Sequence, residues 1–372
     1  MSGKTPNART RAAPQPNPYT DLDDKAFWKT AVAGRSAFDI EGLWQPKFRI
    51  LPKHRIVTAG SCFAQHIGRA LAARRYHWVD AEPAPLALSA ESRKHFNYGV
   101  FSFRTGNIYT ATALLQWVSW AFGEATPPTE VWEKDGRFYD PFRPAIEPGG
   151  FENAQELFAS REVTLAAIRR AVRESDIFVF TMGLTEAWYN LAAGHEYAMC
   201  PGTLAGTFDP AEHAFRNQPF NQIRRDLRAA LNIMRGHNRG LRFLLTVSPV
   251  PLTATASGEH VLTATTLSKS TLRAVAGDMV SRSRFTDYFP SYEIITSCPY
   301  RGMFYEPNMR SVSPHGVAHV MNTFFADQAA KFGAQRYADN PQTEGHETSK
   351  DTPPPSVEDL VCEEEMLNAF QR

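Results

Sequence analysis

The residue best placed for chemistry is Ser61, which falls where a predicted buried strand gives way to a helix. Residues 56–59 (Ile-Val-Thr-Ala) form a β-branched and small apolar run typical of a strand buried on both faces. Gly60 ends the run, and from Phe63 the apolar residues recur at helical spacing. A hydroxyl at this junction lies beside the unpaired N–H groups of the first helical turn, which favour an oxyanion. The position suits a nucleophilic serine, although serine is also a common helix cap without a catalytic role.

Residues 60–64 spell Gly-Ser-Cys-Phe-Ala, and on this string the chain resembles the GSCFA family, which is similar to the SGNH/GDSL hydrolase superfamily. Three further strings carry the resemblance: SPVPL at 248–252, SKS at 268–270 and YFPSYE at 288–293. In that superfamily the serine after the first strand is the nucleophile of an esterase, a role that the resemblance implies for Ser61. The family is similar to proteins of bacterial polysaccharide synthesis. The implied function is a serine esterase or O-acyltransferase acting on an acylated carbohydrate or other small ester.

The resemblance also implies donors for the oxyanion that forms when a serine attacks an ester. The superfamily takes them from the serine N–H, from a glycine, and from an asparagine that follows the third strand. Here Gly183 matches a block glycine, and the Ser61 N–H is the other backbone donor. Thr185 or Glu186 stands at the asparagine position, and we expect both to contact the substrate.

Because a carboxylate is a poor oxyanion donor, residues of another segment are needed as substitutes. The segment FNYGVFSFRTGNIYT offers Asn97, Gly99 and Asn107. Glycine and asparagine are equally common in turns that have no catalytic role. We therefore expect this segment either to complete the oxyanion site or to form ordinary turns.

A serine nucleophile also needs a base. The superfamily carries Asp-x-x-His before its last helix, but here Asn308 stands at the aspartate position and Ser311 at the histidine position. His260, in a loop after the predicted fourth strand, and His315, in the first turn of the last helix, are the alternatives. His66 lies five residues past Ser61 on a helix and is expected to point away from it.

Loss of the Asp-x-x-His pair motivates a second interpretation of the chain. It would then be a catalytically degenerate protein of the same fold that binds a glycan or a protein partner. The aromatic residues Trp117, Trp120 and Trp188 could stack on sugars, although core packing explains them as well.

Composition excludes several classes of function. Forty Lys and Arg against 39 Asp and Glu give a formal net charge of +1, so no general attraction to nucleic acid or anionic membranes is expected. The four cysteines have no metal-type spacing and no His/Asp/Glu cluster has ligand spacing, so we expect no metal and no cofactor. Scattered cysteines favour a cytoplasmic protein. The N-terminus lacks the apolar core of a signal peptide, and no apolar run approaches the ~20 residues of a membrane span.

Strand and helix patterns alternate about five times along the chain, which is typical of a doubly wound α/β fold. We expect a mostly parallel, five-stranded, SGNH-hydrolase-like sheet with flavodoxin-like strand order. The predicted strands are residues 56–59, 77–80, 177–183, 241–247 and 285–295. The predicted helices begin at residue 63 and continue with residues 111–122, 153–174, 221–238, 266–281 and 314–332.

The rest of the chain is assigned around this domain, which spans residues 19–335. Residues 83–150 exceed an ordinary connection and are expected to form an inserted lobe after the second strand, with a hairpin at Asp135-Gly136. Residues 1–18 are expected to be a disordered arm. Residues 336–372 carry nine acidic and three basic side chains and are expected to be a disordered acidic tail. Within this tail, residues 357–370 could instead form a short amphipathic helix for a partner.

Overall fold

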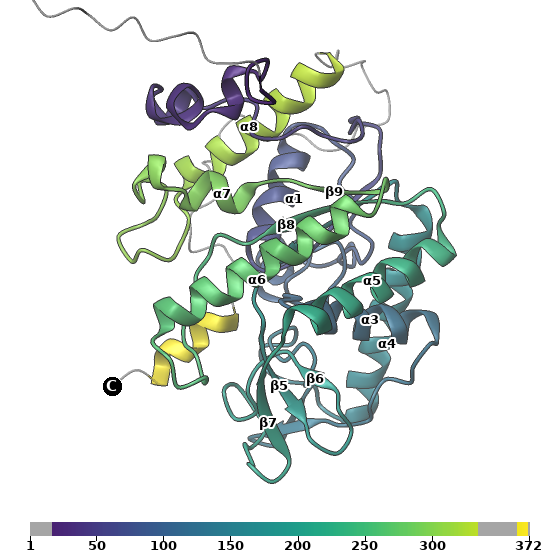
Figure 1. The fold of residues 1–372 in the computed structure, drawn as a ribbon. Coiled ribbons are helices and arrows are strands. Elements are labelled where there is room, and N and C mark those ends of the chain that lie inside the picture. The colour runs from purple at the N-terminus through teal and green to yellow at the C-terminus, as the bar shows by residue number, and fades with distance from the viewer. Residues whose placement is uncertain (1–16, 334–362, 371–372) are drawn as a thin grey trace, which may run out of the picture. The chain divides into compact units, whose positions relative to one another are not determined.

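The computed structural model describes residues 17–333 and 363–370 of the chain (Figure 1). Contacts divide the chain into two units, Met1–Gly42 and Leu43–Arg372. All strands and all the longer helices belong to the second unit, which therefore holds the candidate site. The described residues of the first unit form three short helical turns: Asp24–Ala26, Lys29–Ala33 and Ala37–Asp39. The predicted N-terminal arm lies outside the described residues except for its last two positions.

A four-stranded parallel sheet forms the centre of the second unit, with the strand order β1-β4-β8-β9. Its strands are almost continuous runs of buried residues, as expected when helices cover both faces. In register, Gly60 pairs with Thr181 and Thr181 with Thr246, so the carboxyl ends of three strands meet at one edge. The strands are β1 (Ile56–Gly60), β4 (Ile177–Met182), β8 (Arg242–Val247) and β9 (Thr286–Tyr288).

The predicted five-stranded sheet is corrected to four strands in the described part of the chain. The expected second strand is reduced to a single parallel bridge between Ile56 and Trp78. The cause is Ser102, whose hydroxyl accepts the N–H of Thr58 (3.0 Å) and whose carbonyl accepts the N–H of Ala81 (2.7 Å). These bonds take the groups that would extend the ladder beyond Ile56, so pairing stops after one residue.

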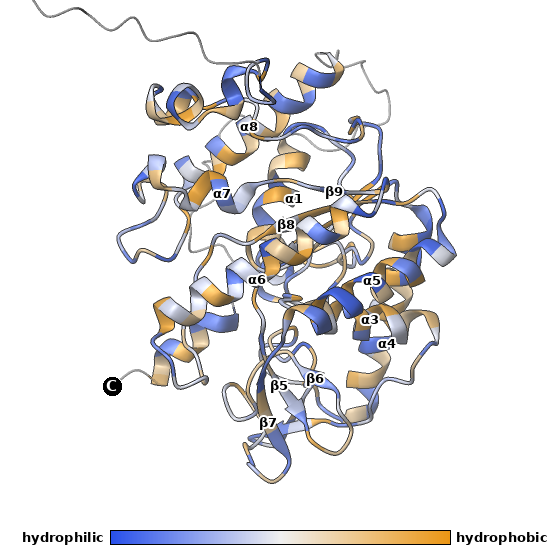
Figure 2. Cartoon of the chain, in the orientation of Figure 1, coloured by the Kyte–Doolittle hydropathy of each residue, from blue (hydrophilic) through white to orange (hydrophobic). Residues whose placement is uncertain are grey.

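Helices cover both faces of the sheet (Figure 1). On one side α1 contacts β1, β4 and α8, and on the other side α5 contacts α3, α4 and α6. Figure 2 shows polar and apolar segments alternating along α5 and α6, the pattern of helices with one buried face. These helices are α1 (Phe63–Ala73), α3 (Ala111–Phe122), α4 (Ala154–Glu174), α5 (Phe220–His237), α6 (Val261–Ser281) and α8 (Pro314–Phe332).

The region predicted as an inserted lobe is joined to the main core. It holds α2 (Ala90–His95), α3 and the predicted hairpin of β2 (Trp132–Lys134) and β3 (Arg137–Tyr139). Trp117 of α3 is buried in the same apolar cluster as Phe178 and Phe180 of β4. Helix α3 packs on α5 and α4, and it is not a separate lobe because its buried face belongs to the same core as the main sheet.

A second sheet, which the sequence analysis did not predict, follows the carboxyl end of β4. It is antiparallel, with the order β6-β5-β7, and consists of β5 (Glu186–Asn190), β6 (Glu196–Tyr197) and β7 (His213–Asn217). Residues 285–295, predicted as one strand, divide into β9 and the short helix α7 (Ser291–Thr296). Pro290 immediately precedes this helix, where its fixed φ suits a helix start.

The end of the chain supplies one more element, a 3₁₀ helix at Glu363–Phe370, here called the C-terminal helix. Disorder was predicted for residues 336–372. Within that range the structure describes only residues 363–370, and there the prediction is wrong because they form this helix. Across the described ranges, none of the helices combines the length and the hydropathy that a membrane span requires.

Candidate functional site

Ser61 lies between β1 and α1, at the carboxyl edge of the central sheet. Its N–H donates to the carbonyl of Thr181 (2.9 Å), which holds the junction against β4. Gly60 has a φ of +132°, and a Cβ there would lie 2.2 Å from the Thr181 carbonyl oxygen, so only glycine fits. The Ser61 side chain is buried, and its hydroxyl has no hydrogen-bond partner among the described residues. The junction is therefore built as expected, but the hydroxyl is not engaged by a base.

Four of the predicted oxyanion donors are not available in this arrangement. The N–H groups of Ser61 and Gly183 are both spent on backbone carbonyls, the second on Tyr109 (2.8 Å). Gly99 lies in an exposed turn with a φ of +70°. Asn97, the other substitute, donates its side-chain amide to the carbonyl of Ala145 (3.1 Å). Gly183 nevertheless lies against Ser61, because a Cβ built on it would be 3.1 Å from the Ser61 Cβ.

Asn107 is the predicted donor that does hold an anion, and the anion is the carboxylate of Glu363. The Asn107 N–H donates to Glu363 Oε1 (3.3 Å), and its side-chain amide donates to Oε2. The Tyr109 hydroxyl also donates to Oε2 (3.2 Å). Burial raises the pKa of Glu363, and these donors partly offset that rise. Asn107 and Tyr109 thus bind a carboxylate.

None of the described histidines reaches the Ser61 hydroxyl. His260 is exposed and caps α6, its Nδ1 accepting the Leu262 N–H (3.2 Å). His315 is exposed, with its ring 5.9 Å from that of Phe304. Burial lowers the pKa of His66 to about 4, so its imidazole is neutral at pH 7. The structure does not bring either predicted base to the predicted nucleophile.

Asn308 and Ser311 reproduce a contact of the expected Asp-x-x-His pair without its titratable groups. The Asn308 side-chain amide donates to the Ser311 hydroxyl (2.9 Å). Ser311 lines a cavity of about 20 Å³ together with Cys62 and Phe63, directly after Ser61. Such a space suits a single water molecule. The segment lies beside the start of α1, but it carries neither a carboxylate nor an imidazole at these two positions.

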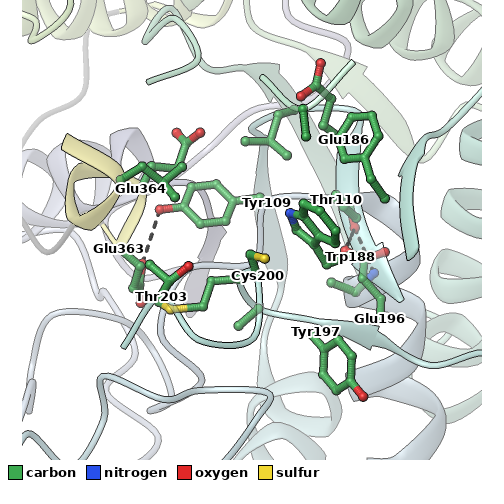
Figure 3. Close-up of a pocket in the computed structure, with 18 of the residues that line it drawn as sticks. Tyr109, Thr110, Glu186, Trp188, Glu196, Tyr197, Cys200, Thr203, Glu363 and Glu364 are labelled. Carbon is green, nitrogen blue, oxygen red and sulfur yellow. Dashed lines mark hydrogen bonds between the residues drawn. The ribbon is translucent and has the colours of Figure 1, made fainter. Parts of the chain in front are cut away.

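A larger cavity, of about 480 Å³, opens beside this junction (Figure 3). Tyr109 lies in its wall and also touches Gly183, which touches Ser61. Of the predicted site residues, Asn107 and Glu186 line the cavity, whereas the others do not. Thr185 instead donates its N–H to Ser268 and its hydroxyl to Asn217 (2.6 Å). The aromatic part of the lining consists of Tyr109, Trp117, Phe142, Trp188, Tyr197, Phe208, Phe215 and Phe370.

Two carboxyl groups, Glu186 and Glu196, lie toward the other end of the cavity from Glu363 (Figure 3). Glu196 accepts hydrogen bonds from Thr110, Tyr189 and Gln218 at 2.5–2.9 Å, yet burial raises its pKa to about 7. Burial also raises the pKa of Glu186, which accepts from the Thr255 hydroxyl (2.8 Å). Glu196 is thus partly protonated near neutral pH, and burial shifts the pKa of Glu186 in the same direction.

Two cations lie behind the Glu363 end, and the sequence analysis missed both. Lys269 is buried on α6 and donates to the carbonyl of Gly183. Arg310 pairs with Glu364 (3.2 Å) and Glu365 (3.3 Å) of the C-terminal helix. The spacing of α6 could have identified Lys269 as a buried cation. It stands three and seven residues before Leu272 and Ala276, on the same buried face of the helix. Arg310 gives no such signal, because its partners are more than 50 positions away.

Comparison with known sequences adds the family. The family model described as GSCFA matches residues 55–324, which is more than half of the chain and includes the whole central sheet. No curated protein and no solved structure matches the chain. The match begins just before β1, contains the Gly-Ser-Cys-Phe-Ala string, and ends inside α8. The chain belongs to the GSCFA family.

Proposed function

We propose that this protein binds a small carbohydrate ligand, including acylated sugars, in the cavity beside Ser61, and that it lacks the base of an esterase. The observation that carries the proposal is the cavity itself. Its volume of about 480 Å³ lies in the range of small-molecule sites, and its wall combines aromatic faces with a few polar groups. Aromatic rings pack against the apolar faces of sugars, and carboxyl and amide groups bind their hydroxyls.

Trp188 is the aromatic side chain best placed for such stacking. It is half-buried and lines the cavity, with edge contacts to Phe208 (5.2 Å) and Phe215 (5.7 Å) that fix its plane. Figure 3 shows its indole between the carboxyl groups at the two ends of the cavity. A ring held in this way loses little entropy when a ligand packs on it.

A serine esterase or O-acyltransferase is the second candidate, favoured by the Ser61 hydroxyl. A buried hydroxyl with no partner among the described residues costs about 1–3 kcal/mol, and such groups concentrate at catalytic sites. In this candidate Ser61 attacks the acyl carbon of a bound acylated carbohydrate and transfers the acyl group to water or to a second hydroxyl. It requires a base from outside the arrangement described above. Cys200 is a poor alternative nucleophile, because burial raises the pKa of its thiol to about 11.

Several finer expectations remain part of the proposal. The single bridge at Trp78 would place a reduced second strand next to β1, which supports an SGNH-like fold with flavodoxin-like order. The link to bacterial polysaccharide metabolism and the cytoplasmic location stay predictions from the resemblance and from the scattered cysteines.

The test is calorimetric titration of the full chain with acetylated xylotriose at millimolar concentration. We expect binding that weakens about tenfold, or about 1.4 kcal/mol, in Trp188→Ala and is partly recovered in Trp188→Phe. Trp28→Ala is the matched control, because Trp28 is exposed and belongs to the other unit. Equal affinity of wild type and Trp188→Ala for the sugar, or no detectable heat of binding in the wild-type titration, would refute the proposal.

A further inference from the structure

The C-terminal helix contributes to the lining of the cavity in the manner of a ligand. Glu363, Glu364, Leu367 and Phe370 all line it, so two carboxyl groups and two apolar side chains of one short segment form part of its wall. Figure 3 shows the two glutamates on this segment. The chemistry of a wall that the end of the chain supplies indicates what the rest of the cavity can bind. This part of the wall is anionic at one point and apolar beyond it.

The carboxylate of Glu363 lies in a site built to hold it. Asn107 and Tyr109 are both more than nine-tenths buried, and together they direct two N–H groups and one O–H group at its two oxygens. Gly106, with a φ of +71°, lets the loop come this close, because a Cβ there would lie 2.7 Å from Glu363 Oε1. Three converging donors and a glycine opening are the usual means of binding an anion.

The two cations give an independent reason to expect an anion here. Arg310 is paired with Glu364 and Glu365, and the buried Lys269 stabilises the ionised form of Glu364. Removing the C-terminal helix takes away the acidic partners that it supplies to them. An anionic group that enters in place of the helix meets the same two positive charges that now face its glutamates.

We propose that Asn107 and Tyr109 form a carboxylate subsite for an acidic sugar, and that the C-terminal helix competes with this ligand by placing Glu363 in the subsite. The inference rests on the proposed carbohydrate-binding function and narrows it to sugars that bear a carboxylate, such as uronic acids. The sugar ring takes the place of Leu367 and Phe370 against the aromatic wall. A docked helix lowers the apparent affinity, which equals the intrinsic affinity multiplied by the fraction of molecules whose site is open.

The test uses phenyl β-D-glucuronide and phenyl β-D-glucoside, which differ only by a carboxylate in place of a hydroxymethyl group. Calorimetric titrations compare the full chain with Glu363→Ala and with the matched control Glu162→Ala, at an exposed glutamate of α4 that does not line the cavity. Alanine at 363 removes the carboxyl group and leaves the buried donors of Asn107 and Tyr109 without this acceptor when the helix is docked, so docking weakens. We expect Glu363→Ala to bind the glucuronide about tenfold more tightly, and Glu162→Ala to match wild type.

A second variant shows whether the subsite itself is responsible. In the Glu363→Ala background, Asn107→Ala is expected to abolish the preference for the glucuronide over the glucoside while retaining the cooperative thermal transition. Equal binding of the two glycosides by every variant would overturn the subsite and leave carbohydrate binding standing. Binding of neither glycoside nor acetylated xylotriose would overturn both. Octanoate binding to Glu363→Ala in place of the glucuronide would overturn the assignment to a sugar.

Discussion

The side-chain amide of Asn107 donates to the carboxylate of Glu363, although 256 positions separate the two residues. This contact joins the C-terminal helix to the segment between α2 and α3. It also fixes the polarity of the cavity, with an anion-binding end at Asn107 and the acidic groups Glu186 and Glu196 toward the other end. Such a division favours a ligand that is itself polar at both ends and apolar between them.

Glu196 should make the protein less stable as pH rises. Its pKa is about 7 when folded, against an ordinary 4.5, because burial disfavours its charge. A raised carboxyl pKa leaves stability complete below about pH 4.5 and removes it as pH rises through 7, by at most about 3 kcal/mol. Glu196→Gln should therefore be more stable than wild type at pH 8 but not at pH 5, as measured by urea unfolding. An equal pH dependence in both proteins would contradict this.

The pKa of Glu363 and that of Glu364 are both raised by burial, which makes docking of the C-terminal helix pH-dependent. The docked state binds protons more readily than the released state, so docking is most favourable below about pH 4.5 and weakens as pH rises through the docked pKa values. Asn107 and Tyr109 face Glu363, and their hydrogen bonds lower its pKa without reversing the rise that burial causes.

The cations that face Glu364, namely Arg310 and Lys269, lower its pKa and so reduce the size of the effect without reversing its sign. A 4-fluorophenylalanine at position 370 of the full chain would report docking by ¹⁹F NMR. We expect the docked population to fall between pH 5 and pH 8, and to change less in Glu363→Gln. A docked population that rises over this interval would show that the sign is wrong.

Restoring the missing acid–base pair should activate Ser61. Asn308 already bonds Ser311, and Ser311 lies at a small cavity next to Cys62, so Asn308→Asp with Ser311→His introduces an oriented imidazole beside α1. We expect a fluorophosphonate to label Ser61 in this double variant, detected by peptide mass spectrometry. Single substitutions, each lacking one group of the pair, serve as controls. An unlabelled Ser61 in a folded double variant would argue against the correspondence of these positions.

Gly60 should be the least replaceable glycine of the junction. A Cβ there meets the Thr181 carbonyl oxygen at 2.2 Å and the φ of +132° is unfavourable for other residues, so Gly60→Ala should cost about 3 kcal/mol of folding free energy. Gly236→Ala is the matched control on α5, where a Cβ has no neighbour within 4 Å and alanine favours the helix by about 0.5–1 kcal/mol. Urea unfolding that places both variants on the same side of wild type would refute the contrast.

Local sequence pattern predicted the long helices and the parallel sheet well. Residues 111–122 and 314–332 are helices with the predicted bounds, because caps and apolar spacing are encoded within the helix itself. The start of α6 was missed by five residues, since His260 supplies the cap through its ring nitrogen. The β5–β7 sheet was also missed, because its strands are short and pair mainly with one another.

The site was harder to predict because its contacts join distant parts of the chain. Asn107 and Glu186 were named and do line the cavity, but their partners, Glu363 and Thr255, follow from tertiary packing. The bond from the Thr58 N–H to the Ser102 hydroxyl, which replaces pairing with a second strand, also joins distant positions and could not be predicted from local sequence. Sequence alone shows which residues can donate or accept, and the fold decides which of them meet.

The central claim is that the cavity binds a sugar ligand without Ser61 chemistry. The most direct measurement is the acetyl content of acetylated xylotriose after prolonged incubation with saturating wild-type protein, compared with Ser61→Ala. We predict that both proteins bind the sugar and that its acetyl groups remain intact in both samples. Deacetylation by wild type that Ser61→Ala abolishes would contradict the claim and establish a serine esterase.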